Sequence, residues 1–408
     1  MTVEMKKYKL GDLIDVSRGK SLAGEFYATS GNLVRLTMGN FDYINNCFKQ
    51  NTSKDNLFFS GKVEEKFILN AGDIITPLTE QTPGLLGSTA RIPESGKYIQ
   101  SQDVALVRCK KDKLDDGFAY YLISSESVKK QLGAAAQQTK IRHTSPDKIK
   151  DCTVYIPEIS IQKKIGNILS TLDKRIENLR AQNRVLEQTA KTIYDYTFLQ
   201  CAGRQTTYNK TLNRNIPADW EVKRLGDLVS VSKESLNPQN YPEKQFKHYS
   251  IPSFDDNGSY SLEYGKDIFS NKFIVNNNHV LISKLNPWKN RAVWCDENDD
   301  AIGSTEFVTL LPRKLENKAF VFSIVKSDSF IEYCSDAATG TSHSHRRVSP
   351  DIMMKFPIAY DEKTVIKFNA QVTPLFKKQL VNTKQIEALT TQRNTLLPLL
   401  MTGQVEVG

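Results

Sequence analysis

The side chains that could carry out catalysis in this chain are few and poorly spaced for it. Asp55 followed by Glu64-Glu65-Lys66 resembles a nuclease-like Asp…Glu-x-Lys pattern, but such short charged matches often arise by chance. His343 and His345 could bind a metal ion, yet a polar loop is the simpler interpretation because no cysteine or carboxylate stands at ligand spacing. Asn286-Pro287-Trp288 lacks the second proline of an amino-methyltransferase motif.

Motifs that hold cofactors are also absent from the sequence. There is no glycine-rich FxGxG-like loop for a methyl donor and no GxxxxGK[ST] loop for ATP. We therefore expect no catalytic residue, no metal ligand and no cofactor in this chain.

Two loops in each half of the chain carry polar and basic side chains suited to DNA. The first loop follows an apolar run, and a solvated hairpin explains any one of its residues equally well. The second loop precedes a Ser-Pro-Asp sequence, and its small, basic residues favour phosphate contacts. Arginine and lysine suit guanine and phosphates, whereas asparagine and glutamine suit adenine. The candidate DNA-binding residues are Thr79, Gln81, Thr82, Gln138, Lys140, Arg142, Lys284, Asn286, Lys289, Arg291, Ser344, His345, Arg346 and Arg347.

The elements that must position these loops occur twice, in the same order. A period near two hundred residues is far too long for a solenoid repeat of roughly 20–50 residues and indicates a duplicated domain. Because the copies differ most in their middles, we expect two similar contacts with different specificities. The repeated segments are Leu10-Gly11-Asp12-Leu13 with Leu225-Gly226-Asp227-Leu228, Phe67-Ile68-Leu69-Asn70 with Phe273-Ile274-Val275-Asn276, and Ser145-Pro146-Asp147 with Ser349-Pro350-Asp351.

Short apolar runs and turn residues predict a mixed α/β domain in the first half. Residues 67–69 and 73–75 read as strands joined by a turn, and residues 104–107 as a further strand. Residues 118–132 have the spacing of a helix.

Each half then runs into a long amphipathic helix. Apolar residues alternate by threes and fours for about three and a half heptads in the first helix, which is typical of a coiled-coil seam. Asn183 on this seam is the kind of residue that fixes register. Because the second domain follows a short linker, it lies near the end of the first helix. Its own helix can therefore bury its apolar face on the first helix only if the two helices run antiparallel. The seam residues are Leu169, Leu172, Ile176, Leu179, Asn183, Leu186 and Ile193, with Phe376, Leu380, Ile386 and Leu389.

The predicted fold class is therefore α+β, or mixed α/β. We expect two related domains separated by two long antiparallel coiled-coil helices, with pseudo-two-fold symmetry. Such a spacer would make the protein read two DNA half-sites at a fixed separation. The expected parts are domain one (1–160), a central helix (161–200), a linker (201–222), domain two (223–363) and a C-terminal helix (364–402).

Composition agrees with a DNA partner. The chain has 408 residues, 39% of them hydrophobic, and a formal net charge of +9. A basic balance favours an anionic partner, most commonly nucleic acid. Six scattered cysteines without a metal or disulfide framework, and no secretory or membrane-spanning segment, predict a soluble cytoplasmic protein that does not enter a membrane.

The layout resembles the specificity subunit of Type I restriction–modification enzymes. The resemblance covers nearly the whole chain, and its strength lies in the order of the matching segments around two helices. The second half lacks the glutamine that follows Pro157 in the first half, so the sequence leaves the start of the second helix open. The matching segments are Lys9-Leu10-Gly11-Asp12, residues 156–165 (IPEISIQKKI), residues 216–220 (IPADW) and residues 395–403 (TLLPLLMTG).

The resemblance implies partners and a division of labour. Each domain would be a target-recognition domain that reads one half of a bipartite, asymmetric double-stranded DNA site. The helices would dock two modification subunits, which carry S-adenosylmethionine and methylate adenine. Restriction (motor) subunits would supply ATP and Mg²⁺ chemistry, and this chain would be non-catalytic. Two alternatives are an adaptor whose basic domains bind acidic proteins, and a self-contained methyltransferase or nuclease, which the missing motifs disfavour.

Overall fold

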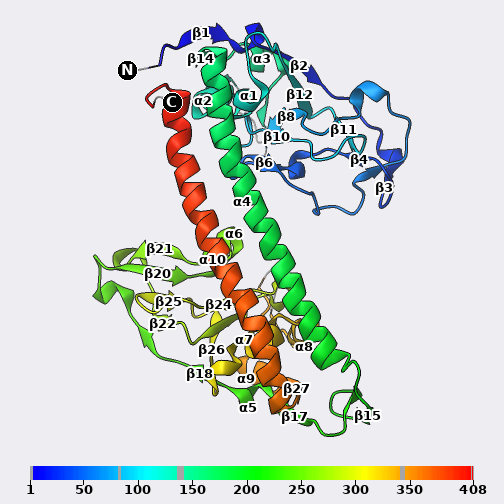
Figure 1. Ribbon diagram of the computed structural model, residues 1–408, viewed down its shortest axis with the longest axis vertical. Coiled ribbons are helices and arrows are strands. Elements are labelled where there is room, and N and C mark those ends of the chain that lie inside the picture. The colour runs from blue at the N-terminus through cyan, green and yellow to red at the C-terminus, as the bar shows by residue number, and fades with distance from the viewer. Residues whose placement is uncertain (1–2, 81–83, 136–141, 341–344, 406, 408) are drawn as a thin grey trace. The chain divides into compact units, whose positions relative to one another are not determined.

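The computed structural model describes residues 3–80, 84–135, 142–340, 345–405 and 407. The chain divides into two compact units, and each is described by itself (Figure 1). Unit 1 comprises Met1–Glu177 and Glu387–Gly408, and unit 2 comprises Asn178–Ile386. Each unit therefore contains one sheet-rich domain and a part of both long helices.

Unit 1 is built on two small sheets with helices beside them. Hydrophobic residues of β2 (Ile14–Arg18), β8 (Ile74–Pro77) and β12 (Val104–Cys109) share a buried cluster with three helices. These are α1 (Asp116–Ile123), α2 (Glu126–Ala135) and α3 (Pro146–Lys150). The first sheet has the order β10 (Ala90–Arg91), β8 (Ile74–Pro77), β12 (Val104–Cys109), β2 (Ile14–Arg18). The second has the order β11 (Tyr98–Ile99), β4 (Val34–Arg35), β7 (Phe58–Phe59), β3 (Tyr27–Ala28).

Unit 2 repeats this topology. Its first sheet has strands in the matching order, and three helices follow as in unit 1, which confirms two related mixed α/β domains. The second sheet differs, since it has five strands instead of four. The first sheet is β24 (Ala292–Trp294), β23 (Val280–Ser283), β26 (Phe307–Pro312), β18 (Val229–Ser232), and the helices are α7 (Lys318–Lys326), α8 (Asp328–Asp336) and α9 (Pro350–Met354). The second sheet is β19 (Ser235–Leu236), β22 (Lys272–Ile274), β25 (Ala301–Gly303), β20 (Gln245–Tyr249), β21 (Ser261–Tyr264).

The repeated Leu-Gly-Asp segment closes each domain. It follows a strand that pairs with the last strand of the same domain: β1 (Lys6–Lys9) with β14 (Thr153–Ile156), and β17 (Glu221–Arg224) with β27 (Pro357–Tyr360). The leucines, Leu10 and Leu225, are fully buried. The Asp12 carboxylate accepts a hydrogen bond from the Lys9 amide at 3.1 Å, and Asp227 accepts one from Arg224 at 2.7 Å. The sequence repeat is thus a repeated turn.

The long helices α4 (Ile159–Tyr194) and α10 (Glu362–Met401) start directly after these closing strands. Gln162 in α4 accepts a hydrogen bond from the Asp115 amide at 3.0 Å, at the start of α1. In α10 the corresponding contact is made by Asn369, which is buried. Its side-chain oxygen accepts a hydrogen bond from the Phe320 amide at 2.9 Å, near the start of α7. The missing glutamine is therefore replaced by an amide further along the helix, and α10 still begins beside its domain.

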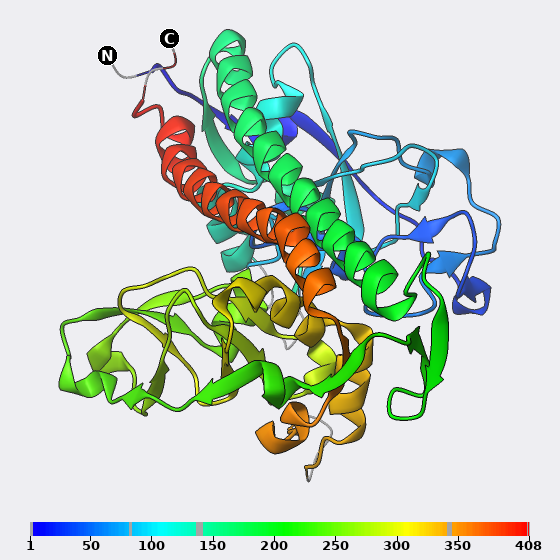
Figure 2. The same ribbon diagram turned by 60° about the horizontal axis from the view of Figure 1, so that its bottom comes forward.

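Within each unit the two helices pack antiparallel, side by side (Figures 1 and 2). In unit 2, Asn183 of α4 accepts from Asn382 of α10 at 2.9 Å and donates to Thr383 at 3.3 Å. In unit 1, the residues of α4 that share a buried cluster with the end of α10 are Ile165 and Leu169. The early part of α4 therefore meets the late part of α10.

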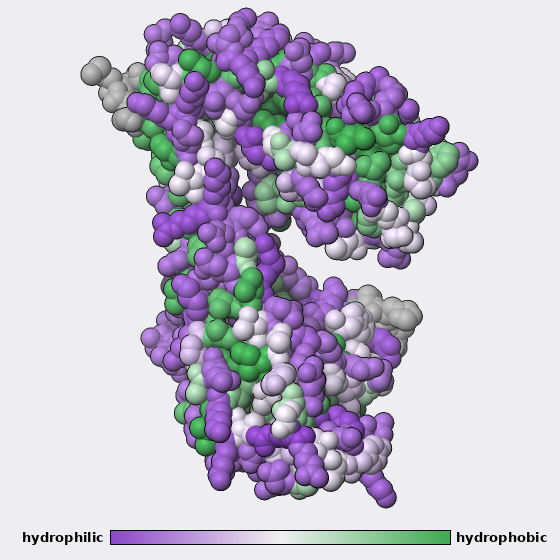
Figure 3. All heavy atoms as spheres, turned by 45° about the vertical axis from the view of Figure 1, so that its right-hand side comes forward, coloured by the Kyte–Doolittle hydropathy of each residue, from purple (hydrophilic) through white to green (hydrophobic). Residues whose placement is uncertain are grey.

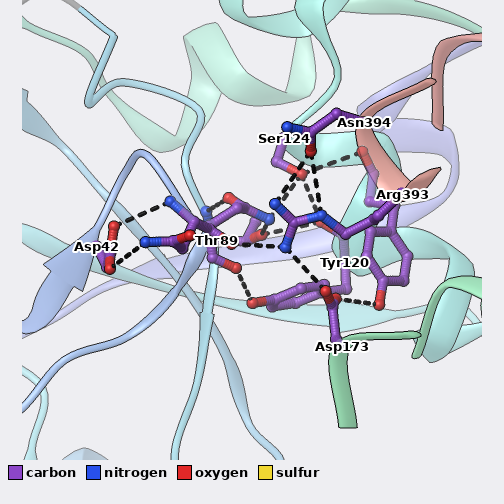
Figure 4. A network of polar contacts seen from close by, with 10 residues as sticks. Asp42, Thr89, Tyr120, Ser124, Asp173, Arg393 and Asn394 are labelled. Atoms are coloured by element: carbon purple, nitrogen blue, oxygen red, sulfur yellow. Dashed lines mark hydrogen bonds and ion pairs between the residues drawn. The ribbon is translucent and has the colours of Figure 1, made fainter. Parts of the chain in front are cut away.

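A second polar layer joins the helices in unit 1 (Figure 4). The Arg393 guanidinium pairs with Asp173 at 2.9 Å and also donates to the Asn45 carbonyl oxygen at 3.3 Å. The Tyr121 hydroxyl donates to the other oxygen of Asp173 at 2.6 Å. Because Arg393 is buried, this network ties α10 to both α4 and the turn that ends at Cys47.

The predicted seam is only in part an interhelical seam. Phe376 is buried, but its ring packs against Trp294 and Phe322 of the domain, with centroids 5.4 and 4.9 Å away. Of the other predicted seam residues, Leu169, Ile176 and Leu179 are buried, whereas Leu172, Asn183, Leu186, Ile193, Leu380, Ile386 and Leu389 are half-buried.

We expect the variant with both Asn183→Leu and Asn382→Leu to have a higher free energy of unfolding than the native chain. Asn382 is buried and Asn183 half-buried, and replacing both partners of such a hydrogen bond by packed leucines is commonly neutral or stabilising, here by up to about 1 kcal/mol. The cost should be a loss of unique helix register, since amides at such positions specify alignment. Denaturant titration measures the first effect, and disulfide trapping between cysteines placed on α4 and α10 measures the second. A variant that is markedly less stable would contradict this expectation.

Two local predictions were wrong, and the expected linker contains regular structure. Residues 118–132 form two helices, because Ser124 and Ser125 end α1 and begin α2, with Ser125 accepting from the Val128 amide at 3.4 Å. Residues 67–69 do not form a strand; Glu65–Phe67 is a 3-10 turn and Ile68 makes a single bridge to Ile99. The expected linker 201–222 holds a hairpin, β15 (Thr206–Asn209) with β16 (Arg214–Pro217).

The expected helix 161–200 is α-helical only to Tyr194 and ends in a π-helical turn, Asp195–Leu199.

In the part of the chain that the structure describes, no helix is both long and apolar enough to cross a bilayer.

Candidate nucleic-acid interface

In unit 1 the two predicted loops lie side by side. Strand β9 (Thr79–Glu80) pairs antiparallel with β13 (Arg142–His143), so that Thr79 faces His143. The Thr144 amide donates to the Leu78 carbonyl oxygen at 2.8 Å and extends the contact. Four candidate residues, Gln81, Thr82, Gln138 and Lys140, lie outside the described residues.

A buried acid, Glu80, holds this pair of loops together. Its carboxylate accepts from the Leu86 amide at 3.0 Å and pairs with the Arg142 guanidinium at 3.3 Å. Glu80 is 3% exposed, whereas the Arg142 side chain is 41% exposed. Arg142 could be named from the sequence but Glu80 could not, because a lone acid in a loop without basic residues gives no sign that it is buried.

In unit 2 the corresponding loops also meet. Arg347 forms bridges to both Leu285 and Thr339. The Asn286 amide donates to the Arg346 carbonyl oxygen at 2.7 Å, and the Asn286 side chain accepts from the Arg346 amide at 3.1 Å. Asn286 has a left-handed backbone with φ of 49°, which asparagine adopts more readily than most residues. Ser344 lies outside the described residues.

Arg291 holds the first loop of unit 2 from inside. Its guanidinium pairs with both carboxylate oxygens of Asp255, in α6 (Ile251–Asn257), at 2.6 and 2.7 Å. It also donates to the Leu285 carbonyl oxygen at 3.2 Å, so one side chain joins both ends of the loop. The hydrogen bonds from Arg291 hold the pKa of the Asp255 carboxyl below its usual value. Only 3% of the Arg291 side chain is exposed, so its contacts support a positioning role for this DNA-binding candidate.

The remaining candidates of unit 2 differ in what they present to solvent. Lys289, at the end of the short 3-10 turn Pro287–Lys289, and His345 are exposed, and Lys284 is half-buried. The Arg347 side chain is 48% exposed and is paired with Glu306. The Arg346 guanidinium donates to the Ala338 carbonyl oxygen. The arrangement can therefore offer cationic and hydrogen-bonding side chains to an anion.

Among the residues that the structure describes, no group of three metal-ligating side chains comes together. Burial raises the pKa of the Cys295 and Cys334 thiols to about 12, so both stay protonated and are poor nucleophiles at neutral pH.

Comparisons with known proteins agree on one family. Residues 2–188 match the family model for the Type I restriction modification DNA specificity domain. The chain is 28% identical over 315 residues to the MjaIX specificity subunit of a Type I restriction enzyme from Methanocaldococcus jannaschii, across 73% of this chain and 71% of that protein. It is 20% identical over 471 residues to the HindI specificity subunit of a Type I restriction enzyme from Haemophilus influenzae, across 98% and 100% of the two chains.

A solved structure shares the fold. The S subunit of the Type I restriction–modification system from M. genitalium superposes with a TM-score of 0.64 at 16% identity. The superposition covers 98% of this chain and 96% of that chain. The similarity therefore includes unit 2, which lies almost wholly beyond the residues that match the family model.

Proposed function

We propose that this chain belongs to the family of Type I restriction–modification specificity subunits and selects the DNA sequence on which a restriction–modification complex acts. Each unit reads one half of a bipartite, asymmetric site in double-stranded DNA. The helix pair sets the spacing between the half-sites.

One observation carries this proposal: both units bring the same two loops together, one after β8 or β23 and one before α3 or α9. The topology is common to the two units, but the side chains are different. Unit 1 presents Thr79 and Arg142, whereas unit 2 presents Lys289, His345 and Arg347. Since base recognition depends on the donors and acceptors that side chains offer, two unlike loop pairs support two unlike half-sites.

The partners in this proposal are two modification subunits and the restriction subunits. The modification subunits supply S-adenosylmethionine and methylate adenine, and the restriction subunits supply ATP and Mg²⁺ chemistry. Figure 3 shows a mostly hydrophilic face with smaller hydrophobic patches. On the long helices of unit 2, Val185 is 65% exposed and Ile366 56% exposed, but single exposed apolar residues are common on protein surfaces, so docking of partners on the helices rests on the similarity to the family. The complex acts in the cytoplasm, and this chain is its non-catalytic recognition part.

The test is to map methylated adenines across the genome in cells with and without the gene. Loss of one motif, made of two short sequences at fixed spacing, is the expected result and names both half-sites. An unchanged pattern in cells that express the modification subunit would reject the proposal and favour an adaptor that binds acidic proteins. Binding of the full chain to duplexes with and without the motif distinguishes the two in solution, because the adaptor predicts no preference.

A further inference from the structure

An exposed arginine at the candidate interface of unit 2 is already held by a carboxylate. Nε and Nη2 of Arg347 lie 3.0 Å from the two carboxylate oxygens of Glu306, so the pair is bidentate. A phosphate group accepts the guanidinium fork in the same geometry. The two side chains are 48% and 30% exposed, so a DNA backbone could reach the arginine and take the place of the acid.

The backbones of both residues are fixed, so only side chains would have to move. The Arg347 amide donates to the Thr339 carbonyl oxygen at 2.8 Å and its carbonyl oxygen accepts from the Thr339 amide at 2.9 Å. The Glu306 carbonyl oxygen accepts from the Lys284 amide at 2.9 Å, and its own amide donates to Ser304 Oγ at 3.3 Å. Arg347 belongs to the second loop, and Glu306 lies in a neighbouring turn whose backbone contacts Lys284 of the first loop, so the pair lies against both loops of the interface.

The other arginines at the two interfaces are bound differently. Arg291 is buried against Asp255, and the Arg346 guanidinium donates to a backbone carbonyl oxygen. In unit 1, Arg142 pairs with Glu80, but that acid is buried and also holds the Leu86 amide. Among these, Arg347 has the exposure and the partially exposed partner that an exchange with phosphate requires.

We propose that Glu306 is a specificity-determining residue, which competes with DNA phosphate for the Arg347 guanidinium. In the cognate complex the other contacts to the second half-site supply the binding energy and the Arg347–Glu306 pair stays closed, so loss of the acid matters most for non-cognate DNA. Such a repulsive or competing element raises discrimination by weakening the wrong complexes. Glu306 lowers affinity for non-cognate DNA, where phosphate contacts supply most of the binding energy. This inference rests on the proposed function.

The experiment compares binding of the full chain to two duplexes of equal length across a range of salt concentrations. One duplex carries both half-sites from the methylation motif, and the other has the second half-site scrambled. We expect Glu306→Gln to tighten binding to the scrambled duplex about two- to fivefold, the range for an exposed ion pair. The salt slope on that duplex should steepen by about 1, as for one added phosphate contact. Binding to the cognate duplex should change less.

Two controls separate competition from a general loss of negative charge. Glu316→Gln makes the same charge change at an exposed position elsewhere in unit 2 and should leave both affinities unchanged. In an Arg347→Ala background, Glu306→Gln should give no further tightening. An equal gain in that background would overturn the inference, because the charge alone would then explain it.

Folding and failure of the proposed function are checked separately. All three tryptophans, Trp220, Trp288 and Trp294, lie in unit 2, so fluorescence reports whether that unit is folded. If Glu306→Gln does not fold, Glu306→Asp shortens the carboxylate arm and should give part of the same gain. Unchanged binding by a folded variant overturns the inference alone, provided that the native chain prefers the cognate duplex. A native chain without that preference rejects the proposed function itself.

Discussion

Replacing Asp255 with alanine should lower the free energy of unfolding of unit 2 by about 3 kcal/mol and abolish selectivity for the second half-site. Removal leaves Arg291 as a buried charge with no carboxylate partner, and only 3% of its side chain is exposed. Breaking a buried ion pair in this way costs about 3–5 kcal/mol. The low end applies because the Asp255 side chain is 46% exposed. Tryptophan fluorescence during urea titration measures the loss in unit 2.

The functional loss follows from the loop that Arg291 holds. Its hydrogen bond to the Leu285 carbonyl oxygen keeps both ends of residues 285–291 together, and Lys289 lies within this segment. Without Asp255 the guanidinium must leave the interior to regain solvent, and the loop opens with it. Binding to a duplex with a scrambled second half-site should then equal binding to the cognate duplex.

A second substitution tests whether the unpaired charge causes the instability. In the variant with both Asp255→Ala and Arg291→Met, no unpaired charge is left at this position, so stability should recover by more than half while selectivity stays lost. A double variant as unstable as Asp255→Ala alone would contradict this account. The comparison is a double-mutant cycle on residues in direct contact, where non-additivity is expected.

The same pair predicts a pH dependence. The pKa of Asp255 is lowered in the folded state by its hydrogen bonds from Arg291. Its stabilisation is therefore fully present above the unfolded pKa of about 3.9 and is lost as the pH falls through the lower folded pKa. The native chain and Asp255→Ala should differ most near neutral pH and converge below about pH 4. A difference that stayed constant down to pH 2 would contradict the assigned cause.

Much of the fold could be predicted because it rests on local repeats. The Leu-Gly-Asp segments mark the closing turn of each domain, and the heptad pattern marks helices whose observed starts, Ile159 and Glu362, lie within two residues of the expected ones. The errors arose where a local signal competed with tertiary contacts. Ser124 and Ser125 interrupt the helix that the apolar spacing of residues 118–132 favours. Asn369 makes the contact to its domain that a glutamine makes in the first half. The two-fold relation between the domains stays a prediction.

The site was harder to predict because burial decides what an arginine does. The sequence does not distinguish Arg291 from Arg347, since both are arginines in basic loops. In the structure Arg291 is buried and paired with Asp255, whereas Arg347 is exposed and paired with Glu306. Asp255 lies 36 positions from Arg291, and Glu306 lies 41 positions from Arg347. No spacing rule connects residues this far apart. The loops themselves could be found from composition, whereas their acidic partners required the structure.

Lengthening both long helices should lengthen the preferred DNA spacer. The loss of affinity should depend on how far the longer spacer rotates one half-site relative to the other about the DNA axis. The insertions belong between Glu177 and Asn178 in α4 and between Ile386 and Glu387 in α10, where the units meet in the sequence. Three heptads add about 31 Å to each helix at roughly 1.5 Å per residue. That length matches about nine base pairs at roughly 3.4 Å each, close to one turn of 10–10.5 base pairs. The two half-sites would then keep nearly the same relative orientation about the DNA axis.

A single heptad is the informative contrast. It adds about 10 Å, or about three base pairs, which rotates one half-site by roughly a third of a turn. We therefore expect the three-heptad variant to bind a duplex with nine or ten extra base pairs nearly as tightly as the native chain binds its own site. The one-heptad variant should bind every spacer in the same panel more weakly. Insertion into α4 alone should leave the helices unable to keep both the pairing of Asn183 with Asn382 and that of Asp173 with Arg393, and should abolish selective binding. A three-heptad variant that still preferred the native spacer would show that the helix pair does not set the spacing.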